Sequence, residues 1–390
     1  MWKRSQHLDF LWDVLILAFT SFGGPQVHMA LFLKRLVQEK KYLDEHELFE
    51  IHALCSVLPG PTSTQVLTAI GYKRGGAVLA YLTTIIWISP AVFVMTLAAF
   101  GMTFLRNREI IHYVLPVGVG LILQAGWFMA QKVISGPLYV FIFLITLFIG
   151  IGFPNPFIFP LVLLLGGTIS SFNYKKFPRQ NKHKMVIPWA NFHLFWGFLV
   201  LLALLGHFTD YFPIRIFENF YRNGSLVFGG GQVLAPVLFT EFVEFKKLLS
   251  ADDFLTGMAL SQSLPGPVFA LTSYLGVLLM KDYGIWGELM GSAIGALGVF
   301  LPGTFMIFFV YRIWGQLKQY RFIRASLAGI QATSVGLTMV AVYTFVNPMI
   351  IQGDFVDVGV VGLTFLLAQY TKIPSIILFS LALLAGILLF

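Results

Sequence analysis

A helix-breaking triplet in the first half of the sequence is followed at once by polar side chains. The triplet is Pro59-Gly60-Pro61, and the next four residues carry three hydroxyls and one amide: Thr62, Ser63, Thr64 and Gln65. Proline removes a backbone donor and clashes with the preceding turn, so the polar residues lie where a new half-helix begins. A helix N-terminus carries about half a positive charge and unpaired N–H groups. Together these groups predict an anion-binding site.

The same triplet recurs in the second half as Pro265, Gly266 and Pro267, 206 residues further along the chain. Here the next residues, 268–271, are all apolar, and hydroxyl side chains return only at 272 and 273. A free backbone group in hydrocarbon costs several kcal/mol, so paired breaks of this kind survive where they face a cavity. They point to a substrate site at the membrane midplane, and we expect the first half to hold the anion.

A glycine-rich motif is duplicated at the same spacing. Residues 22–27 read Phe-Gly-Gly-Pro-Gln-Val, and residues 228–233 read Phe-Gly-Gly-Gly-Gln-Val, again 206 residues apart. Two rare motifs at one offset indicate two homologous halves, and Ser89-Pro90 has a partner in Leu301-Pro302 at an offset of 212. We predict an N-terminal transporter repeat at 1–173, a basic linker at 174–190 and a C-terminal transporter repeat at 191–390.

The composition indicates the class of protein to which these motifs belong. Of 390 residues, 57% are hydrophobic and only 11% are charged, against about 25% charged in an ordinary soluble domain. This excludes a soluble enzyme, which would lack a polar coat, and a disordered chain. Residues 140–152 and 376–390 are continuous apolar runs, whereas a β-barrel alternates apolar and polar positions. We predict an all-α polytopic membrane protein.

A membrane span needs about 20 apolar residues. The predicted spans are residues 10–33, 51–72, 77–104, 110–134, 137–152, 154–173, 191–209, 214–238, 252–278, 285–311, 322–346, 354–371 and 373–390. Six of them lie between the first motif helix and its counterpart, and an even number makes those two helices run in opposite directions. The halves are then inverted-topology repeats with helices broken at the Pro-Gly-Pro motifs, the usual build of an alternating-access transporter.

The net charge of +8 fits cytoplasmic loops rather than nucleic-acid binding. The linker holds five basic residues and no acid, so we expect it to be cytoplasmic. The single cysteine, Cys55, excludes an internal disulfide and a cysteine-based metal cluster. No metal-ligand cluster, phosphate loop or nucleophile elbow is present in the sequence, so we expect no cofactor, no bound metal and no enzyme activity.

Few charged residues lie near the motifs. The candidates for contact with an anion or a proton are Lys34, Arg35, Lys73, Arg74, Glu241 and His28. Arginine offers a planar fork to an oxyanion, His28 could titrate near neutral pH, and Glu241 could relay protons. The plainer interpretations are interfacial snorkelling for the four cations and a packed or interfacial histidine. Glu241 takes the place of Arg35 at the common offset, so the sign of the charge differs between the halves.

Both motifs also have structural interpretations. Pro-Gly-Pro could merely kink two packed helices, and Phe-Gly-Gly could serve a close helix–helix contact through small residues. Gln65, Gln124, Gln262 and Gln331 lie in apolar surroundings, where an amide needs a partner, either substrate or a neighbouring helix.

Residues 21–66, 228–238 and 262–276 resemble the chromate ion transporter superfamily in its long two-domain form. The resemblance covers nearly the whole chain. It implies a multi-pass plasma-membrane carrier that exports chromate and confers chromate resistance, driven by the proton-motive force or by exchange with an oxyanion such as sulfate. It also implies roles for Phe22, Gly23, Gly24, Pro25, Pro59, Gly60, Pro61, Ser63, Gln65 and their counterparts, with Gly231 in the place of Pro25. Chromate and sulfate are similar tetrahedral dianions that no residue here separates.

We therefore expect alternating access around a midplane site that the Phe-Gly-Gly segments close. The predicted substrate-binding residues are Phe22, Gly23, Gly24, Pro25, Gln26, Pro59, Gly60, Pro61, Thr62, Ser63, Thr64, Gln65, Gly229, Gly230, Gly231, Gln232, Gln262, Pro265, Gly266 and Pro267. Ser63→Ala or Gly60→Leu is expected to abolish transport and leave folding intact.

A channel, a membrane enzyme and a scaffold stay open as alternatives. The expected partners are a small oxyanion and the lipid bilayer, not nucleic acid, with a homodimer expected by analogy with other carriers.

Overall fold

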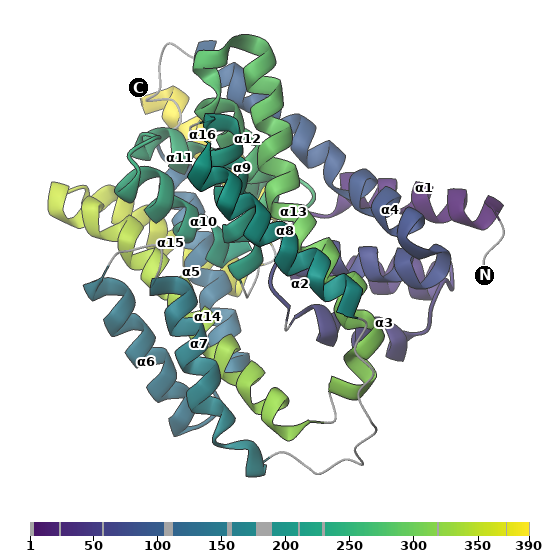
Figure 1. Ribbon diagram of the computed structural model, residues 1–390. Coiled ribbons are helices and arrows are strands. Elements are labelled where there is room, and N and C mark those ends of the chain that lie inside the picture. The colour runs from purple at the N-terminus through teal and green to yellow at the C-terminus, as the bar shows by residue number, and fades with distance from the viewer. Residues whose placement is uncertain are drawn as a thin grey trace. The chain divides into compact units, whose positions relative to one another are not determined.

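The computed structural model describes the chain except for residues 1–3, 23–24, 57, 105–111, 154–157, 177–188, 210, 228–230, 318–319, 372 and 390. Within the described ranges every regular element is a helix (Figure 1). The predicted all-α class is confirmed. The predicted linker at 174–190 lies mostly outside the described residues.

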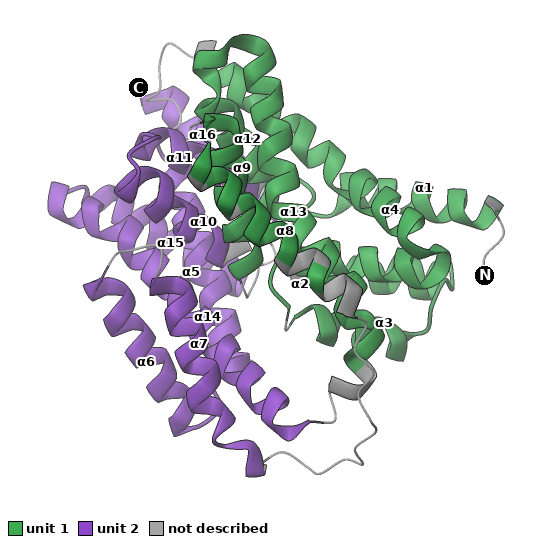
Figure 2. Ribbon diagram, in the orientation of Figure 1, with its two compact units in different colours: residues 1–104, 186–231, 263–314 green, residues 105–185, 232–262, 315–390 purple. Residues whose placement is uncertain are grey.

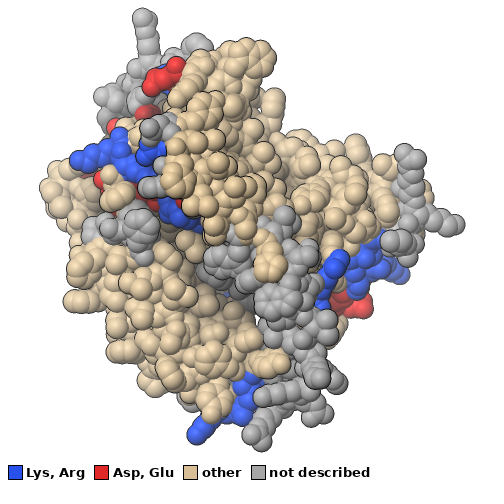
Figure 3. Space-filling view, viewed as in Figure 1, with Lys and Arg blue, Asp and Glu red and all other residues tan. Residues whose placement is uncertain are grey.

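Among the described residues, four helices are long and apolar enough to cross a membrane. They contain residues 62–102, 114–133, 281–314 and 321–352, and shorter apolar helices accompany them. Large apolar side chains such as Phe93, Phe148 and Trp286 point outward and are more than half exposed. On the face drawn in Figure 3, charged atoms gather in a few patches on an otherwise uncharged described surface. Apolar surface on this scale is what a lipid-embedded protein presents.

The chain divides into two compact units, and each unit draws on both sequence halves (Figure 2). Unit 1 comprises residues 1–104, 186–231 and 263–314, and unit 2 comprises 105–185, 232–262 and 315–390. Both Pro-Gly-Pro motifs belong to unit 1. The compact units therefore do not coincide with the two repeats.

Unit 1 takes its helices from both repeats. Those of the first half are α1 (Arg4–Thr20), α2 (Pro25–Phe32), the π-helix η1 (Leu33–Glu39), α3 (Glu45–Cys55) and α4 (Thr62–Phe104). Those of the second half are α8 (Trp189–Phe208), α9 (Phe212–Leu226), η5 (Val268–Ala270), α12 (Leu271–Leu279), η6 (Lys281–Tyr283) and most of α13 (Gly284–Leu317). Helices α1 and α12 both pack against α4.

Unit 2 is organised around the long helix α14 (Arg321–Gln352), which packs against α5, α6 and α7. Its other elements are α5 (Val114–Val133), α6 (Pro137–Gly152), α7 (Ile158–Ser171), η3 (Tyr174–Lys176), most of α10 (Gly231–Phe239), η4 (Thr240–Phe245), α11 (Ala251–Ser263), α15 (Phe355–Tyr370) and α16 (Ser375–Leu389). Gly166 of α7 and Gly329 of α14 face each other so closely that any side chain at either position would collide. Small residues thus allow close helix packing, as in other membrane proteins.

The two sequence halves share unusual backbone conformations at equivalent positions. Lys41 and Lys247 are the positive-φ residues other than glycine among the described residues, and both have φ of 53°. They lie 206 residues apart, and each follows a π-helix. Gly76 and Gly284 have φ of 71° and 67° at the start of equivalent helices. The two glycines are 208 residues apart, close to the offset of the lysines. Because positive φ is uncommon outside glycine, its recurrence at Lys41 and Lys247 supports two homologous halves.

The predicted span at 51–72 is not a crossing helix. Helix α3 ends at Cys55, the chain turns through the Pro-Gly-Pro triplet, and α4 begins at Thr62. The side chains of Lys73 and Arg74 pair with Glu47 at the start of α3. Residues 45–55 and 62–75 therefore run antiparallel, as a hairpin whose tip is the triplet. Gly76 then separates this hairpin from residues 77–104, which match the next predicted span.

Three further predicted spans are interrupted by the same motifs. Residues 10–33 divide into α1 and α2, residues 214–238 divide between α9 and α10, and residues 252–278 divide between α11 and α12. In each case glycine or proline residues stand in the sequence between the two helices. Hydropathy alone did not separate the pieces because both sides of each break are apolar.

The predicted inversion of the halves has direct geometric support within unit 1. The Thr96 hydroxyl of α4 lies 2.6 Å from that of Ser292 in α13, and the rings of Tyr81 and Phe308 are 5.1 Å apart. The two contacts are in opposite order along the two helices, so α4 and α13 run antiparallel. These helices contain the equivalent prolines, Pro90 and Pro302. The inversion thus holds, although the span count behind it included a hairpin.

Candidate anion site at the broken helices

The tips of the two helix breaks form equivalent hydrogen bonds in unit 1. The Gly60 N–H donates to the Val227 carbonyl at 2.8 Å, and the Gly266 N–H donates to the Ser21 carbonyl at 2.8 Å. Both donors and both acceptors are 206 residues apart. Each Pro-Gly-Pro tip is therefore bonded to the residue just before the Phe-Gly-Gly motif of the other half. In this conformation these two N–H groups are not available to an anion.

Both tips require glycine. Gly60 has φ of +110° and Gly266 has φ of +98°, in a region that other residues rarely adopt. A Cβ on Gly60 would lie 3.3 Å from the Gly303 Cα, and one on Gly266 would lie 3.2 Å from the Ala91 Cβ. Gly303 and Ala91 follow the equivalent prolines of α13 and α4. Leucine at position 60 is therefore expected to disturb folding, contrary to the sequence-based expectation.

His28 and Ser63 join α2 to the start of α4 through a buried hydrogen bond. The His28 side chain is 1% exposed. Its Nδ1 lies 3.0 Å from the Ser63 Oγ, and its Nε2 lies 3.2 Å from the Ser21 carbonyl oxygen. The Ser21 carbonyl thus accepts from the His28 ring and from the Gly266 N–H of the second break. His28 is a member of the polar network rather than a merely packed histidine.

The neighbouring side chains at the start of α4 are also engaged. The Trp87 Nε1–H donates to the Thr64 Oγ1 at 3.1 Å, and the Trp87 ring meets the His28 ring edge-on. The Gln65 Nε2 donates to the Pro59 carbonyl at 2.7 Å, whereas its Oε1 is buried with no partner among the described residues. Thr62 is only partly buried. The Gln65 Oε1 is an acceptor, so a donor such as a water molecule would satisfy it, whereas a fully deprotonated oxyanion would not.

Backbone donors complete the site. The N–H groups of Thr62, Ser63 and Thr64 form the first turn of α4 and have no backbone acceptor among the described residues, as expected at a helix start. Residues 62–75 direct their dipole toward this turn. In the first half, unpaired backbone donors thus lie beside hydroxyl side chains. Pro61 ends the break directly before these donors, and its side chain is buried.

Comparison with known proteins agrees with this arrangement. The sequence model of the chromate transporter family matches residues 8–171 and 214–387, two segments that begin 206 residues apart. The chain belongs to the chromate transporter family. It is therefore a multi-pass membrane transporter by family and not an enzyme.

Its relatives include proteins of full and of half length. An uncharacterized transporter of Methanocaldococcus jannaschii is 25% identical, over 87% of this chain and 84% of that protein. The chromate transport protein of Cupriavidus metallidurans is 24% identical, over 87% of this chain and 82% of that protein. An uncharacterized transporter of Bacillus subtilis is 29% identical over 46% of this chain but 95% of its own length, which fits one repeat. No solved structure gives a significant match.

The predicted cations of this chromate transporter family member are paired away from the site. Arg35 binds the buried Asp13 carboxylate at 2.6 Å, and Tyr42 donates to the same carboxylate. Burial and the Asp13 carboxylate raise the pKa of Tyr42 well above its usual range. Lys73 and Arg74 pair with Glu47. Lys34 is exposed. The interpretation of these four residues as anion ligands loses support because their charges are compensated or solvated.

The remaining predicted residues fall into three groups. Phe22 is partly buried, Pro59 and Pro267 are buried, and Pro265 is partly buried. In unit 2, Glu241 pairs with Lys246 at 2.7 Å, and Gln262 is partly buried near the end of α11. The third group lies outside the described residues, or has a described backbone but no described side chain: Gly23, Gly24, Pro25, Gln26, Gly229, Gly230, Gly231 and Gln232.

Two members of the site, Ser21 and Trp87, lie outside the predicted set. A signal for Trp87 exists in the sequence, because a tryptophan in an apolar helix usually finds a partner for its N–H. Ser21 acts through its backbone carbonyl, which no side-chain pattern reveals.

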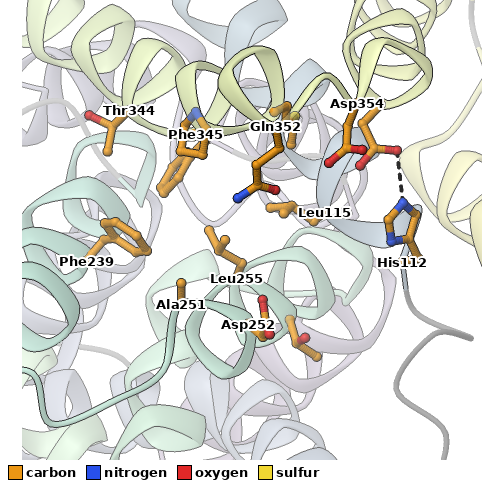
Figure 4. Close-up of a pocket in the computed structure, with 14 residues that line it drawn as sticks. His112, Leu115, Phe239, Ala251, Asp252, Leu255, Thr344, Phe345, Gln352 and Asp354 are labelled. Carbon is orange, nitrogen blue, oxygen red and sulfur yellow. Dashed lines mark hydrogen bonds and ion pairs between the residues drawn. The ribbon is translucent and has the colours of Figure 1, made fainter.

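Unit 2 contains a separate pocket of about 390 Å³ (Figure 4). Three carboxylates line it, from Asp252, Asp354 and Asp357, and the His112 Nε2 lies 3.2 Å from the Asp357 Oδ1. His112 precedes α5, and Asp357 is in the first turn of α15. An acidic lining does not suit an oxyanion, so this pocket is not a second candidate for the substrate site.

Proposed function

We propose that this protein carries a tetrahedral oxyanion of the chromate type across the plasma membrane by alternating access, in the direction of export. The observation that carries the proposal is the set of unpaired donors at the start of α4, next to two helix breaks bonded to each other's halves. The names of the relatives supply the substrate class. Ser63, Thr64 and the N–H groups of residues 62–64 are the proposed donors.

The paired hydrogen bonds support alternating access. Two equivalent hydrogen bonds join the inverted halves, Gly60 to Val227 and Gly266 to Ser21. We assign them as the two gates of the transporter. With both bonds formed, Ser63 and Thr64 of α4 are buried, which corresponds to a closed state. Breaking one bond would free an N–H donor and open the site toward one side of the membrane, and breaking the other would open it toward the opposite side.

The membrane potential favours export of a dianion. Two negative charges that leave an inside-negative cell gain about 4.6 kcal/mol per 100 mV. Export therefore needs no ATP-binding site. Exchange for another oxyanion such as sulfate is a second form of the same proposal, because the donor set does not distinguish two tetrahedral dianions.

The test is chromate flux in proteoliposomes that contain the purified full-length chain. We expect uptake that responds to an imposed membrane potential and that sulfate reduces by competition. Flux that saturates with chromate separates a carrier from a channel. Liposomes with folded protein that move neither chromate nor sulfate under any gradient would overturn the proposal. Chromate resistance of cells that express the chain tests direction, since an importer would increase sensitivity.

A further inference from the structure

The His28 ring lies between a group that can only accept a hydrogen bond and a hydroxyl that can donate or accept. A carbonyl only accepts, so the Nε2 that faces the Ser21 carbonyl at 3.2 Å carries a proton in both charge states of the ring. In the neutral ring Nδ1 then has the free lone pair. It accepts the hydroxyl proton of Ser63, whose Oγ is 3.0 Å away.

A second proton on the ring reverses this hydrogen bond. Nδ1–H then donates to the Ser63 Oγ, and the hydroxyl proton of Ser63 becomes free to turn toward another acceptor. Ser63 lies in the first turn of α4, where the backbone N–H groups of residues 62–64 have no backbone acceptor among the described residues. Protonation of His28 thus adds a hydroxyl donor where a ligand is already indicated.

The described partners of the ring carry no charge. Its hydrogen bonds are with Ser21 and Ser63, and its ring contacts are with Phe32 and Trp87. Helix α2 has no other titratable residue. The ion pairs described near it, in α1, η1, α3 and α4, join Asp13 with Arg35 and Lys40, Arg35 with Glu39, and Glu47 with Lys73 and Arg74. The other acidic and basic residues of these four helices include Asp9, Lys34, Glu45 and Glu50, which are described without a hydrogen bond or ion pair to the His28 ring. A buried imidazolium needs a counter-charge, which a bound anion would supply.

We propose that His28 is the proton-binding residue of the anion site, so that a proton and the anion bind together and one proton travels with each anion. The proton stays on Nδ1 while the anion is bound and leaves when the anion leaves. This inference rests on the proposed oxyanion transport and adds the coupling ion and its binding residue. The dianion with its proton carries one net negative charge, so the membrane potential still favours export, with half the gain of the bare dianion.

The second half has no equivalent of this arrangement. Leu234 and Phe269 occupy the positions that correspond to His28 and Ser63 at the common offset. Neither can bind a proton or donate a hydrogen bond. One proton-binding residue in each chain predicts one proton for each transport cycle.

The experiment measures the KM for chromate at equal pH on both sides of the proteoliposome membrane, over about pH 5.5 to 8. The wild type is expected to lose affinity as the pH rises, by up to about tenfold per pH unit once the ring is mostly neutral. His28→Gln can retain both neutral hydrogen bonds and cannot be protonated. We expect its KM to stay high and to follow only the titration of chromate itself. His46→Gln removes an exposed histidine of α3 and should reproduce the wild-type profile.

A pH-sensitive dye inside the vesicles measures proton movement in the same preparations. We expect chromate influx to acidify wild-type vesicles and to leave His28→Gln vesicles unchanged. A His28→Gln protein with the wild-type pH profile and proton flux would overturn the inference while oxyanion transport stands. Absence of wild-type chromate flux at every pH would overturn the proposed function itself.

Ser63 provides a second test if His28→Gln does not fold. Ser63→Ala removes the hydroxyl that the ring is proposed to release, so the KM should rise and its pH dependence should weaken. Ser63→Thr keeps a hydroxyl and should restore the pH dependence. A wild-type profile in Ser63→Ala would overturn the inference.

Discussion

Gly60 and Gly266 hold similar left-handed backbone conformations, and each donates a 2.8 Å hydrogen bond to the opposite half. The polar side chains of the candidate site have no polar counterparts. The first half has His28, Ser63, Thr64, Gln65 and Trp87, whereas the corresponding positions of the second half, at offsets of 206 and, for Trp87, 212, hold Leu234, Phe269, Ala270, Leu271 and Val299. The backbone conformation is alike in the two halves, but the polar side chains occur in the first half. Both helix breaks therefore belong to the scaffold, whereas the proposed binding side chains lie in the first half.

The largest effect is expected from replacing the two glycines, where the halves should respond alike. Alanine in a left-handed conformation costs roughly 1–2 kcal/mol, and the tight Cβ contacts at both positions add about 1–3 kcal/mol. We expect Gly60→Ala and Gly266→Ala each to lower the thermal stability in detergent and to abolish most chromate flux. Gly101→Ala in α4 meets open space and serves as the control. Full stability in only one of the two variants would contradict the equivalence of the tips.

The Asp13–Arg35 pair is expected to affect stability and not substrate affinity. Arg35→Met leaves the 1%-exposed Asp13 with only Tyr42 and a more distant Lys40. Removing one partner of a buried ion pair costs about 3–5 kcal/mol, and the remaining partners place this case at the lower end. Thermal unfolding should show the loss, while the KM for chromate stays near the wild-type value. Lys34→Met, at the exposed neighbouring position, serves as the control and should change neither the thermal stability nor the KM. A raised KM in Arg35→Met would indicate that Arg35 contacts the anion after all.

Ser63 and Ser273 test whether binding is one-sided. Both are buried serines near the start of the helix that follows a break, Ser63 in α4 and Ser273 in α12. A hydrogen bond to a charged group contributes about 1.5–3 kcal/mol, so Ser63→Ala should raise the KM for chromate by roughly 10- to 150-fold. Ser273→Ala should stay within about twofold, because its Oγ has no partner among the described residues. Equal losses in the two variants would show that both halves bind the anion.

The duplicated motifs made much of this architecture predictable. Pro59-Gly60-Pro61 and its copy located both helix breaks, since proline and left-handed glycine act through local backbone geometry. The hairpin of α3 and residues 62–75 was not predictable from hydropathy, because an apolar stretch of the right length looks the same whether it crosses or returns. The ion pairs of Glu47 with Lys73 and Arg74, which reveal the return, join residues more than 25 positions apart.

The candidate site was predictable only in part for a similar reason. Thr62 to Gln65 follow their break directly, so sequence order alone placed them. Trp87, Ser21 and His28 reach them from other segments of the chain. The expected cations had the right charge, but their partners Asp13 and Glu47 are distant in sequence. Pairing of that kind decides whether a charge is available, and one sequence does not encode it locally.

The smallest effect is expected at Trp87, whose counterpart in the second half is Val299. Trp87→Phe keeps an aromatic ring against His28 and removes the N–H donor to Thr64. One neutral hydrogen bond contributes about 1 kcal/mol, so the KM for chromate should change by about fivefold. Trp127→Phe, at a half-exposed tryptophan of unit 2, is the control. If Thr64 itself donates to the anion, loss of the indole N–H changes its orientation and the KM rises. An unchanged KM would limit the binding set to Ser63 and the backbone, and the contrast between the halves would then depend on the His28–Ser63 pair.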